Sequence, residues 1–206
     1  MSEPQPADVI VRTVIGLLEE GGYDAVHLRE VARQAQVSLT TVYKLFPTRD
    51  ELIATAVEQW MAVNGCAQPG PPPPGESLYG CLMRLLRHVF EPWERNPRML
   101  EVYYRAAQAG AGAERLIKQA YQVIEPTAWA MLDDYEPAYV ADLALILTHI
   151  AHGVVARFAA GEIPITEILP LLERTVYRLT ADNRPGTTRR PHVIPVPDQT
   201  ASDRDD

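Results

Sequence analysis

Cysteines and long apolar runs are both scarce in this sequence of 206 residues. It holds two cysteines, Cys66 and Cys81, which are too few for a disulfide framework and suit a reducing compartment. No run of eighteen apolar residues occurs, so no membrane-spanning helix is expected. The first twenty residues also lack a basic start followed by an apolar stretch. These absences predict a cytoplasmic protein without a membrane partner.

Sequence patterns for catalysis and for metal binding are missing as well. There is no glycine-rich phosphate loop, nucleophile elbow or paired-metal pattern, and Glu101, Glu125 and Asp142 are isolated carboxylates. His149 and His152 are three residues apart and would share a helix face, but no cysteine or carboxylate pattern completes a metal site. Neither cysteine lies beside an evident activating base, which speaks against redox sensing. We therefore expect no enzyme activity, no cofactor and no metal.

The most informative stretch runs from Leu28 to Glu51. It contains two short helical patterns separated at residues 35–38. Ser38 stands where an N-cap of the second helix belongs, and Pro47 ends that helix because it disfavours helical geometry at Phe46. Two helices joined by so tight a turn form a helix-turn-helix, whose second helix enters a DNA major groove. The apolar positions are Leu28, Val31, Ala32 and Ala35, then Leu39, Val42, Leu45 and Phe46, and the spacing predicts the last two in the core.

The same stretch resembles the N-terminal DNA-binding domain of the TetR family of transcriptional repressors. The resemblance covers roughly residues 7 to 62. It rests on the run Leu28-Arg29-Glu30-Val31-Ala32, the turn Val37-Ser38, the aromatic pair Tyr43 and Phe46, and the restart Thr48-Arg49-Asp50-Glu51-Leu52, all in family order. It implies an all-α fold of about nine helices. A three-helix DNA-binding domain would precede a helical ligand-binding and dimerisation domain, for which the resemblance is one of layout only.

Composition places the domain boundaries. Thr48 and Glu51 form a capping box that starts a fourth helix, which would connect the two domains. Four consecutive prolines favour an extended, semi-rigid loop after it. The expected division is a disordered N-terminus at 1–6, the DNA-binding domain with its connecting helix at 7–64, a Pro/Gly-rich loop at 65–75, the helical ligand-binding and dimerisation domain at 76–183, and a disordered tail at 184–206. The expected helices outside the helix-turn-helix span about 7–20, 49–64, 76–94, 98–109, 113–132 with a kink at Pro126, 138–160 and 165–181.

The predicted DNA contacts centre on the second motif helix. Thr40 and Thr41 would be its outward N-terminal residues, and a threonine hydroxyl and methyl suit several base atoms. The net charge of −8 is unusual for a DNA-binding protein, but residues 29–49 carry four basic side chains and one acidic one. Phosphate contact depends on such local charge because salt screens distant charges. The predicted DNA-contacting residues are Arg29, Ser38, Leu39, Thr40, Thr41, Tyr43, Lys44 and Arg49.

Aromatic residues cluster in the middle of the chain, with few charges among them. Amphipathic aromatics suit a mostly apolar pocket with a few orienting hydroxyls, although a helical core uses the same residues. We therefore predict a small hydrophobic effector, with core packing as the alternative for each side chain. The predicted pocket residues are Trp93, Met99, Tyr103, Tyr104, Tyr121 and Trp129.

Residues 138–160 are nearly free of charge apart from Asp142 and Arg157. A helix that is apolar around most of its circumference must be buried on more than one side. The resemblance implies a homodimer in which this helix and the next form a four-helix bundle with their copies, and the alternative is a helix central to one chain. The predicted interface residues are His149, His152, Val155, Leu169, Leu172 and Val176.

These patterns together predict a TetR-type transcriptional regulator. It would be a repressor that binds a palindromic double-stranded DNA operator as a homodimer and is released by a small hydrophobic effector. Two alternatives stay open at this point. One is a regulator of the same kind without a small-molecule ligand, and the other is a helical small-molecule-binding protein or enzyme.

Overall fold

The computed structural model describes residues 5–64, 73, 75–110, 112–132 and 135–181, and gives only the backbone of residues 121 and 123–131. Cys66, residues 1–4 of the predicted disordered N-terminus, the predicted disordered tail and nearly all of the Pro/Gly-rich loop lie outside these residues. Pro6 already belongs to α1. Within them the chain is all-α and contains no strand. The elements are α1 (Pro6–Gly21), η1 (Tyr23–Ala25), α2 (Leu28–Gln34), α3 (Leu39–Leu45), α4 (Arg49–Asn64), α5 (Leu78–Arg95), α6 (Pro97–Gln108), α7 (Ala113–Leu132), α8 (Pro137–Ala159), η2 (Ile165–Glu167) and α9 (Ile168–Thr180).

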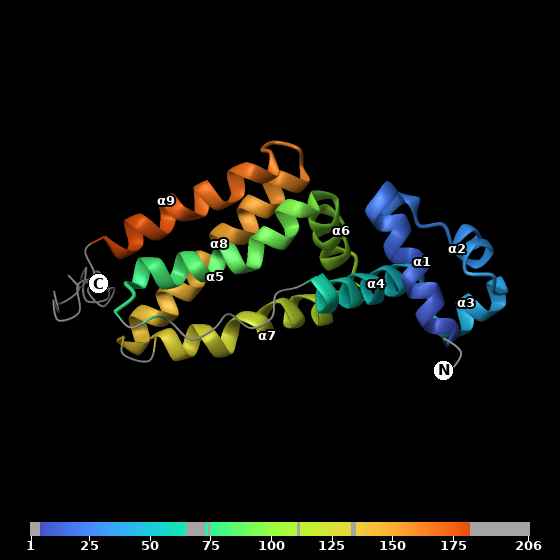
Figure 1. The fold of residues 1–206 in the computed structure, drawn as a ribbon, viewed down its shortest axis with the longest axis horizontal. Helices are drawn as coiled ribbons and strands as arrows, with labels where there is room; N and C mark the ends of the chain where they lie inside the picture. Colours follow the sequence, from blue (N-terminus) through green and yellow to red (C-terminus); the bar gives the residue numbers. More distant parts are fainter. Residues whose placement is uncertain (1–4, 65–72, 74, 111, 133–134, 182–206) are drawn as a thin grey trace, which may run out of the picture.

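Figure 1 shows an elongated arrangement with α1, α2 and α3 at one end and much of α5, α8 and α9 toward the other. Helices α4 and α6 lie between the two ends, and α7 runs along one side. The predicted all-α fold and the order of its helices are confirmed. Helix α7 spans the predicted range and continues through Pro126, and a short 3-10 turn, η2, precedes α9.

Helix α1 packs on α4 through one stripe of residues. Ile10, Val14 and Leu18 are four residues apart, so they share a helix face, and each is fully buried. Gly22 caps the C-terminus of the helix. Its φ of 73° lies in the region that favours glycine, and its N–H donates to the carbonyl of Leu18. The buried residues of α4 are Leu52, Ile53, Ala54, Ala56, Val57 and Trp60.

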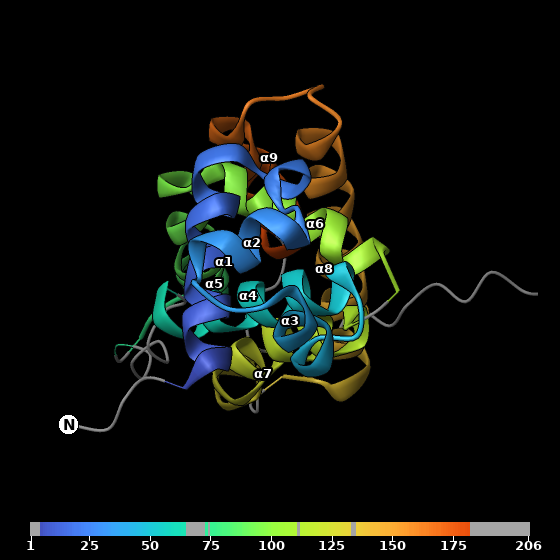
Figure 2. The ribbon, with the colours of Figure 1, turned by 90° about the vertical axis from the view of Figure 1, so that its right-hand side faces the viewer.

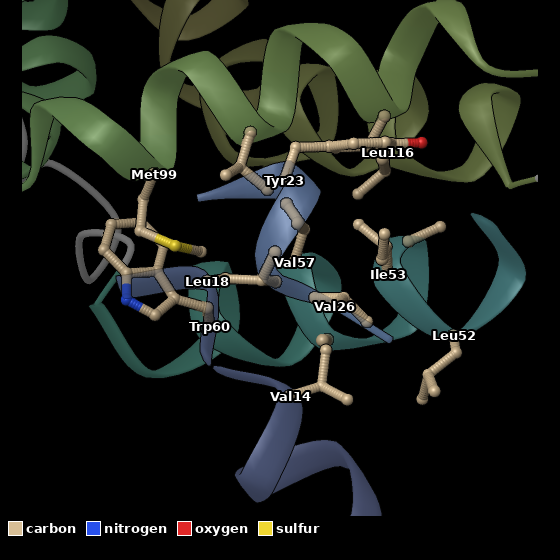
Figure 3. Packing of buried hydrophobic residues seen from close by; sticks show 14 of the residues in the cluster. Val14, Leu18, Tyr23, Val26, Leu52, Ile53, Val57, Trp60, Met99 and Leu116 are labelled. Carbon is tan, nitrogen blue, oxygen red and sulfur yellow. The ribbon is translucent and has the colours of Figure 1, made fainter. Parts of the chain in front are cut away.

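The hydrophobic core of this end continues without a break into the C-terminal helices. The Trp60 and Trp93 ring centroids are 4.9 Å apart, and the Trp93 and Tyr103 centroids are 5.5 Å apart. Figure 3 shows the side chain of Met99 pointing toward the Trp60 indole. The indole N–H of Trp60 donates to a carboxylate oxygen of Glu19 at 2.8 Å, so its one polar group is satisfied. One cluster of buried residues therefore joins α1 and α4 to α5, α6, α7, α8 and α9.

A second buried cluster joins α5, α8 and α9, with Leu82, Leu143 and Val176 among its members. Helix α8 is nevertheless poorly covered. By length and composition it is the one described helix that would suit a membrane span, yet only 17% of its most apolar window is buried. Core helices and interface helices of soluble proteins meet the same criterion. The exposed apolar side of α8 is therefore the feature of the fold that needs explanation.

The prediction that Leu45 belongs to the core is wrong. Its side chain is 42% exposed, whereas that of Phe46 is 7% exposed. Helix α3 ends at Leu45, and Phe46 takes extended backbone angles at the C-cap. The helical spacing that linked the two residues therefore stops between them, and only Phe46 turns inward.

Candidate nucleic-acid interface

The turn between α2 and α3 is built from residues 35–38. The Val37 N–H donates to the carbonyl of Ala32 at 3.0 Å, and Gln36 adopts a φ of 55°. Side chains other than glycine enter this left-handed region at a cost, so the turn holds Gln36 in a strained conformation. The sequence gives no sign of this strain, because the usual signal of a positive φ is a glycine and this position holds a glutamine.

Ser38 caps α3 as predicted. Its Oγ accepts the Thr41 N–H at 3.0 Å and pairs with the Thr41 Oγ1 at 2.7 Å. Thr48 does the same for α4, since its Oγ1 accepts the Glu51 N–H at 3.1 Å. The Glu51 carboxylate forms an ion pair with Arg115 at 2.8 Å. The first bond of the predicted capping box is thus confirmed, and the Glu51 side chain connects α4 to α7.

Buried Val42 sets the outward face of α3. Because Val42 is fully buried, Thr40 and Lys44, which lie four residues apart on the opposite face, point outward, and both are exposed. Tyr43 flanks them and is 53% exposed. Figure 2 looks onto the end of the molecule that carries α2 and α3, where α3 lies at the surface. The outward face of α3 therefore presents hydroxyls, a phenol and one cation.

The eight predicted DNA-contacting residues occupy different environments. Arg29, Ser38, Thr40, Tyr43 and Lys44 are exposed, and Thr41 is half-buried beside its capping partner. Leu39 is half-buried and packs against the core, which leaves little of it for a base. Six of the eight thus share one exposed surface around α3 and the start of α2.

Arg49 lies apart from that surface. Its Nε donates to the carbonyl of Val26 at 2.7 Å, and a terminal nitrogen donates to the carbonyl of Tyr23. Its guanidinium carbon lies 4.6 Å from the centre of the Tyr23 ring. The side chain is directed inward by these contacts, so Arg49 braces the start of α4 against the segment before α2.

The positive charge of this end is concentrated in few groups. Arg33 donates to the carboxylate of Glu30 at 2.9 Å, and Gln34 donates to the same group at 2.7 Å. These hydrogen bonds lower the pKa of Glu30 to about 2. Since Arg33 is matched by Glu30 and Arg49 donates to backbone carbonyls, Arg29 and Lys44 are the cations of residues 29–49 that remain for phosphates.

Of the six residues predicted to line an effector pocket, the structure describes the side chains of four. Trp93 is 8% exposed and Met99 is 1% exposed, and both belong to the main buried cluster. Tyr103 and Tyr104 are half-buried, and the Tyr104 ring lies 5.9 Å from that of His152. The side chains of Tyr121 and Trp129 lie outside the described residues. Met99 also lines a hollow of about 440 Å³, whose other lining residues are Glu19, Arg95, Asn96, Pro97, Arg98, Glu101 and Phe158.

Three of the six predicted interface residues lie inside the single chain. Val155 is 8% exposed, and Leu172 and Val176 are fully buried, because α9 packs against both α5 and α8. These three side chains therefore contribute to the core of the single chain. His149 and His152 are exposed on α8, and Leu169 is half-buried. The exposed apolar residues that the sequence interpretation missed are Leu145 (59%), Ile146 (39%) and Ile150 (39%) on α8, and Tyr177 (63%) on α9.

Cys81 is buried and its thiol is protonated near neutral pH. Burial is the main cause that raises its pKa, to about 11, and the Glu76 carboxylate, which accepts its S–H at 3.1 Å, adds to the shift. A reactive cysteine needs a lowered pKa and an exposed sulfur. The environment of Cys81 provides neither.

Two family models match the chain, one for each half. Residues 10–56 match the model for bacterial regulatory proteins of the tetR family. Residues 75–179 match the model for the tetracyclin repressor-like C-terminal domain. The first match contains the helix-turn-helix, and the second extends from the end of the proline-rich stretch to α9.

Individual proteins agree with these matches. The HTH-type transcriptional repressor KstR of Rhodococcus jostii is 26% identical over 186 residues, which cover 88% of this chain and 84% of the relative. A crystal structure of a TetR transcriptional regulator from Rhodococcus sp. RHA1 superposes with a TM-score of 0.60 at 20% identity, covering 85% of this chain and 97% of the other. A second, a TetR-like regulator from the same source, gives a TM-score of 0.56 at 22% identity over 88% and 100% of the two chains. With its helix-turn-helix at one end and a matching C-terminal domain at the other, this chain belongs to the TetR family of bacterial transcriptional regulators.

Proposed function

We propose that this regulator is a cytoplasmic repressor that binds a palindromic operator as a homodimer and is released by a small hydrophobic effector. The observation that carries the proposal is the outward face of α3, where Thr40, Tyr43 and Lys44 are exposed on a helix anchored by buried Val42. A short helix of this kind, preceded by a tight turn, suits insertion into a major groove. The name of the Rhodococcus jostii relative, a transcriptional repressor, supports the direction of regulation.

The exposed residues of α3 would make the contacts to DNA. Thr40 would meet a base edge, and Tyr43 and Lys44 would meet a base edge or a phosphate. Arg29 at the start of α2 would hold the flanking phosphate. We leave Arg49 and Leu39 out of the contact set, since the first is directed to backbone carbonyls and the second to the core.

The homodimer is supported by the exposed apolar residues of α8. Leu145, Ile146 and Ile150 lie along one helix and would be covered by the same residues of a second copy, as a two-fold interface requires. Two copies would then place two α3 helices in successive major grooves, about 34–36 Å apart. Operator half-sites would be related by the same two-fold symmetry.

Release by an effector requires that the ligand bind the DNA-incompetent arrangement more tightly than the DNA-bound one. A nearly complete switch needs a difference of about 5.5 kcal/mol between these affinities. The apolar and aromatic composition of the C-terminal domain supports a hydrophobic ligand. Helix α4, which runs from the helix-turn-helix into the shared core at Trp60, would carry the change between the domains.

One observation favours a regulator without a small-molecule ligand as the second candidate. Trp93 and Met99, predicted for a pocket, are packed in the core. Thermal-shift screening with hydrophobic metabolites separates the two candidates, since a ligand that binds the folded state raises the melting temperature. An effector must also bind the operator complex more weakly than the free protein, because the coupling is reciprocal.

The DNA-reading assignment is tested by Tyr43→Ala combined with Lys44→Ala. Both side chains are exposed, so the double variant should keep its helicity and its oligomeric state while specific operator binding is lost. Fluorescence anisotropy with an operator selected from random DNA measures the loss, and circular dichroism and sedimentation check the fold. Lys118→Ala removes the other lysine of the chain, exposed on α7, and should bind as the wild type does. Unchanged binding by the double variant would refute the assignment.

A further inference from the structure

We propose that α6 positions the DNA-reading head through Arg98 and Arg105, and that Arg105 is a positioning residue for operator binding. The head is α2, the turn and α3, and its root is the pair of segments that join it to α1 and α4, residues 22–27 and 46–50. The inference rests on the proposed reading of DNA by α3. It adds a connection between the domains that does not run through the sequence of α4.

The two segments of the root are tied to each other. Arg49, at the start of α4, donates to the carbonyl oxygens of Tyr23 and Val26. The phenol of Tyr23 donates to a carboxylate oxygen of Asp50 at 2.8 Å. The segments before and after the head, residues 22–27 and 46–50, are therefore held together. A displacement of one segment would move the whole head.

Helix α6 contacts that root with two arginines. Arg98 and Arg105 are seven residues apart, which is about two helical turns, so they lie on one face of the helix. Arg98 donates to the carbonyl oxygen of Glu19 at 3.0 Å and to that of Glu20, two of the groups that the end of α1 leaves without helical partners. Arg105 donates through both terminal nitrogens to the carboxylate of Asp24, at 2.8 and 2.9 Å.

Tyr23 is contacted both by Arg105 of α6 and by Arg49 within the root. The guanidinium carbon of Arg105 lies 4.3 Å from the centre of the Tyr23 ring, and that of Arg49 lies 4.6 Å from it. A guanidinium at this distance from an aromatic ring is attracted to it, and a bidentate pair fixes orientation as well as distance. Arg105 thus contacts the side chains of two consecutive root residues, Tyr23 and Asp24.

The exposure of this contact indicates that it sets position more than stability. The side chains of Arg105 and Asp24 are 38% and 78% exposed, and ion pairs at such exposure contribute little to folding. The head also packs on α1 through α2, so a contact that holds both the root and the end of α1 acts on α1 and the head together. A shift of α6 along its axis would pull residues 19–24 with it and turn α3. In a dimer, this would change the distance between the two reading helices.

The test uses the full-length protein and two single variants, Arg105→Ala and Asp24→Asn. Each should weaken operator binding about tenfold, within the usual range for coupling between sites. Binding to non-operator DNA should stay within about twofold, because it depends on charge at the surface of α3 rather than on the spacing of the heads. The two changes together should weaken operator binding no more than Arg105→Ala alone, since the contact removed by Asp24→Asn is one of those that Arg105→Ala removes.

Hydrogen exchange provides a measurement that needs no DNA. Arg105→Ala should speed exchange of the amides of residues 22–27 several-fold while leaving those of α9 unchanged. The control is Arg157→Ala, which removes an exposed pair with Glu162 at 3.0 Å on α8 and should alter neither exchange at the root nor operator affinity. The melting temperatures of Arg105→Ala and Arg157→Ala should both fall only slightly and by similar amounts.

The inference would be overturned by wild-type operator affinity in Arg105→Ala, or by unchanged exchange at residues 22–27. A uniform rise in exchange with a lower melting temperature would also overturn it, since that describes a general loss of stability. A wild-type protein that binds no operator would refute the proposed function instead. The exchange experiment would then still decide whether α6 holds the root.

Discussion

The outward faces of α3 and α8 differ in chemistry and in the way each is specified. Helix α3 exposes hydroxyls, a phenol and a lysine, while α8 exposes Leu145, Ile146 and Ile150. The first face suits a hydrated, charged polymer, and the second suits another apolar surface. The difference separates the two partners proposed for this regulator, since DNA would contact one end of the molecule and a second copy the other.

The same comparison shows how far each surface depends on the rest of the chain. Helix α3 has seven residues and is oriented by near neighbours, namely the Ser38 cap and buried Val42. The exposed side of α8 is defined only once α6 and α9 have covered the other sides. The DNA-facing surface of α3 can therefore be specified by nearby residues in the sequence. The exposed apolar surface of α8 instead depends on which sides of that helix the other helices cover.

The largest expected effect comes from placing a charge on the pairing face. Leu145→Glu would bury a carboxylate in each half of a two-fold interface, and an unpaired buried charge costs about 3–5 kcal/mol. The dimer dissociation constant should rise more than about 100-fold, and operator affinity should fall with it. Analytical ultracentrifugation measures the first effect and anisotropy the second. Val63→Glu, at an aliphatic position of α4 that is 76% exposed, is the matched control. A Leu145→Glu protein that still sediments as a dimer would remove α8 from the interface.

A smaller effect is expected on the reading face. Thr40→Ala removes one hydroxyl and one methyl from the outward side of α3. It should change the preference at one base pair of each half-site by about 1–3 kcal/mol, leaving the other positions and the dimer unaltered. Selection of bound sequences from random DNA, compared with the wild type, measures the change. If the preferred sequence stays the same at every position, Thr40 lies away from the bases.

The smallest effect concerns the turn that presents α3. Gln36 has a φ of 55°, and glycine tolerates this conformation at lower cost, against a larger loss of chain entropy on folding. Gln36→Gly should therefore raise the free energy of unfolding by about 0.5–1 kcal/mol. Urea denaturation measures this change in the free energy of unfolding, and dimerisation through α8 should be unaffected. Gln36→Ala, which keeps the unfavourable geometry, serves as the control, and a loss of stability in the glycine variant would contradict the explanation.

The parts of the fold that follow from local signals were predictable from sequence. Ser38, Thr48 and Gly22 mark helix ends through hydrogen bonds and backbone angles that involve only near neighbours. The helix-turn-helix and most helix bounds follow from such signals and from apolar spacing. The same spacing failed at Leu45, because it carries no information about the residue at which the helix stops.

Where the structure departs from the sequence expectations, the reason lies in three-dimensional packing. Leu172 and Val176 have the spacing of an interface helix, but that spacing fits the side of α9 facing α5 equally well. Arg49 has the position of a phosphate contact, and only the structure shows carbonyl oxygens within its reach. Trp93 and Met99 illustrate the same limit, since an aromatic or sulfur side chain suits a pocket wall and a filled core alike.

The undivided core has a consequence for how such a regulator evolves. Trp60 of α4 stacks with Trp93 of α5, and Leu116 of α7 is fully buried in the same cluster as Val57. Cutting the chain near residue 64 would remove 11 of the 28 buried residues of that cluster and expose apolar side chains to water. The two halves are thus poor candidates for recombination with halves of other regulators, and a new signal is more readily acquired by altering the C-terminal helices in place than by exchanging them.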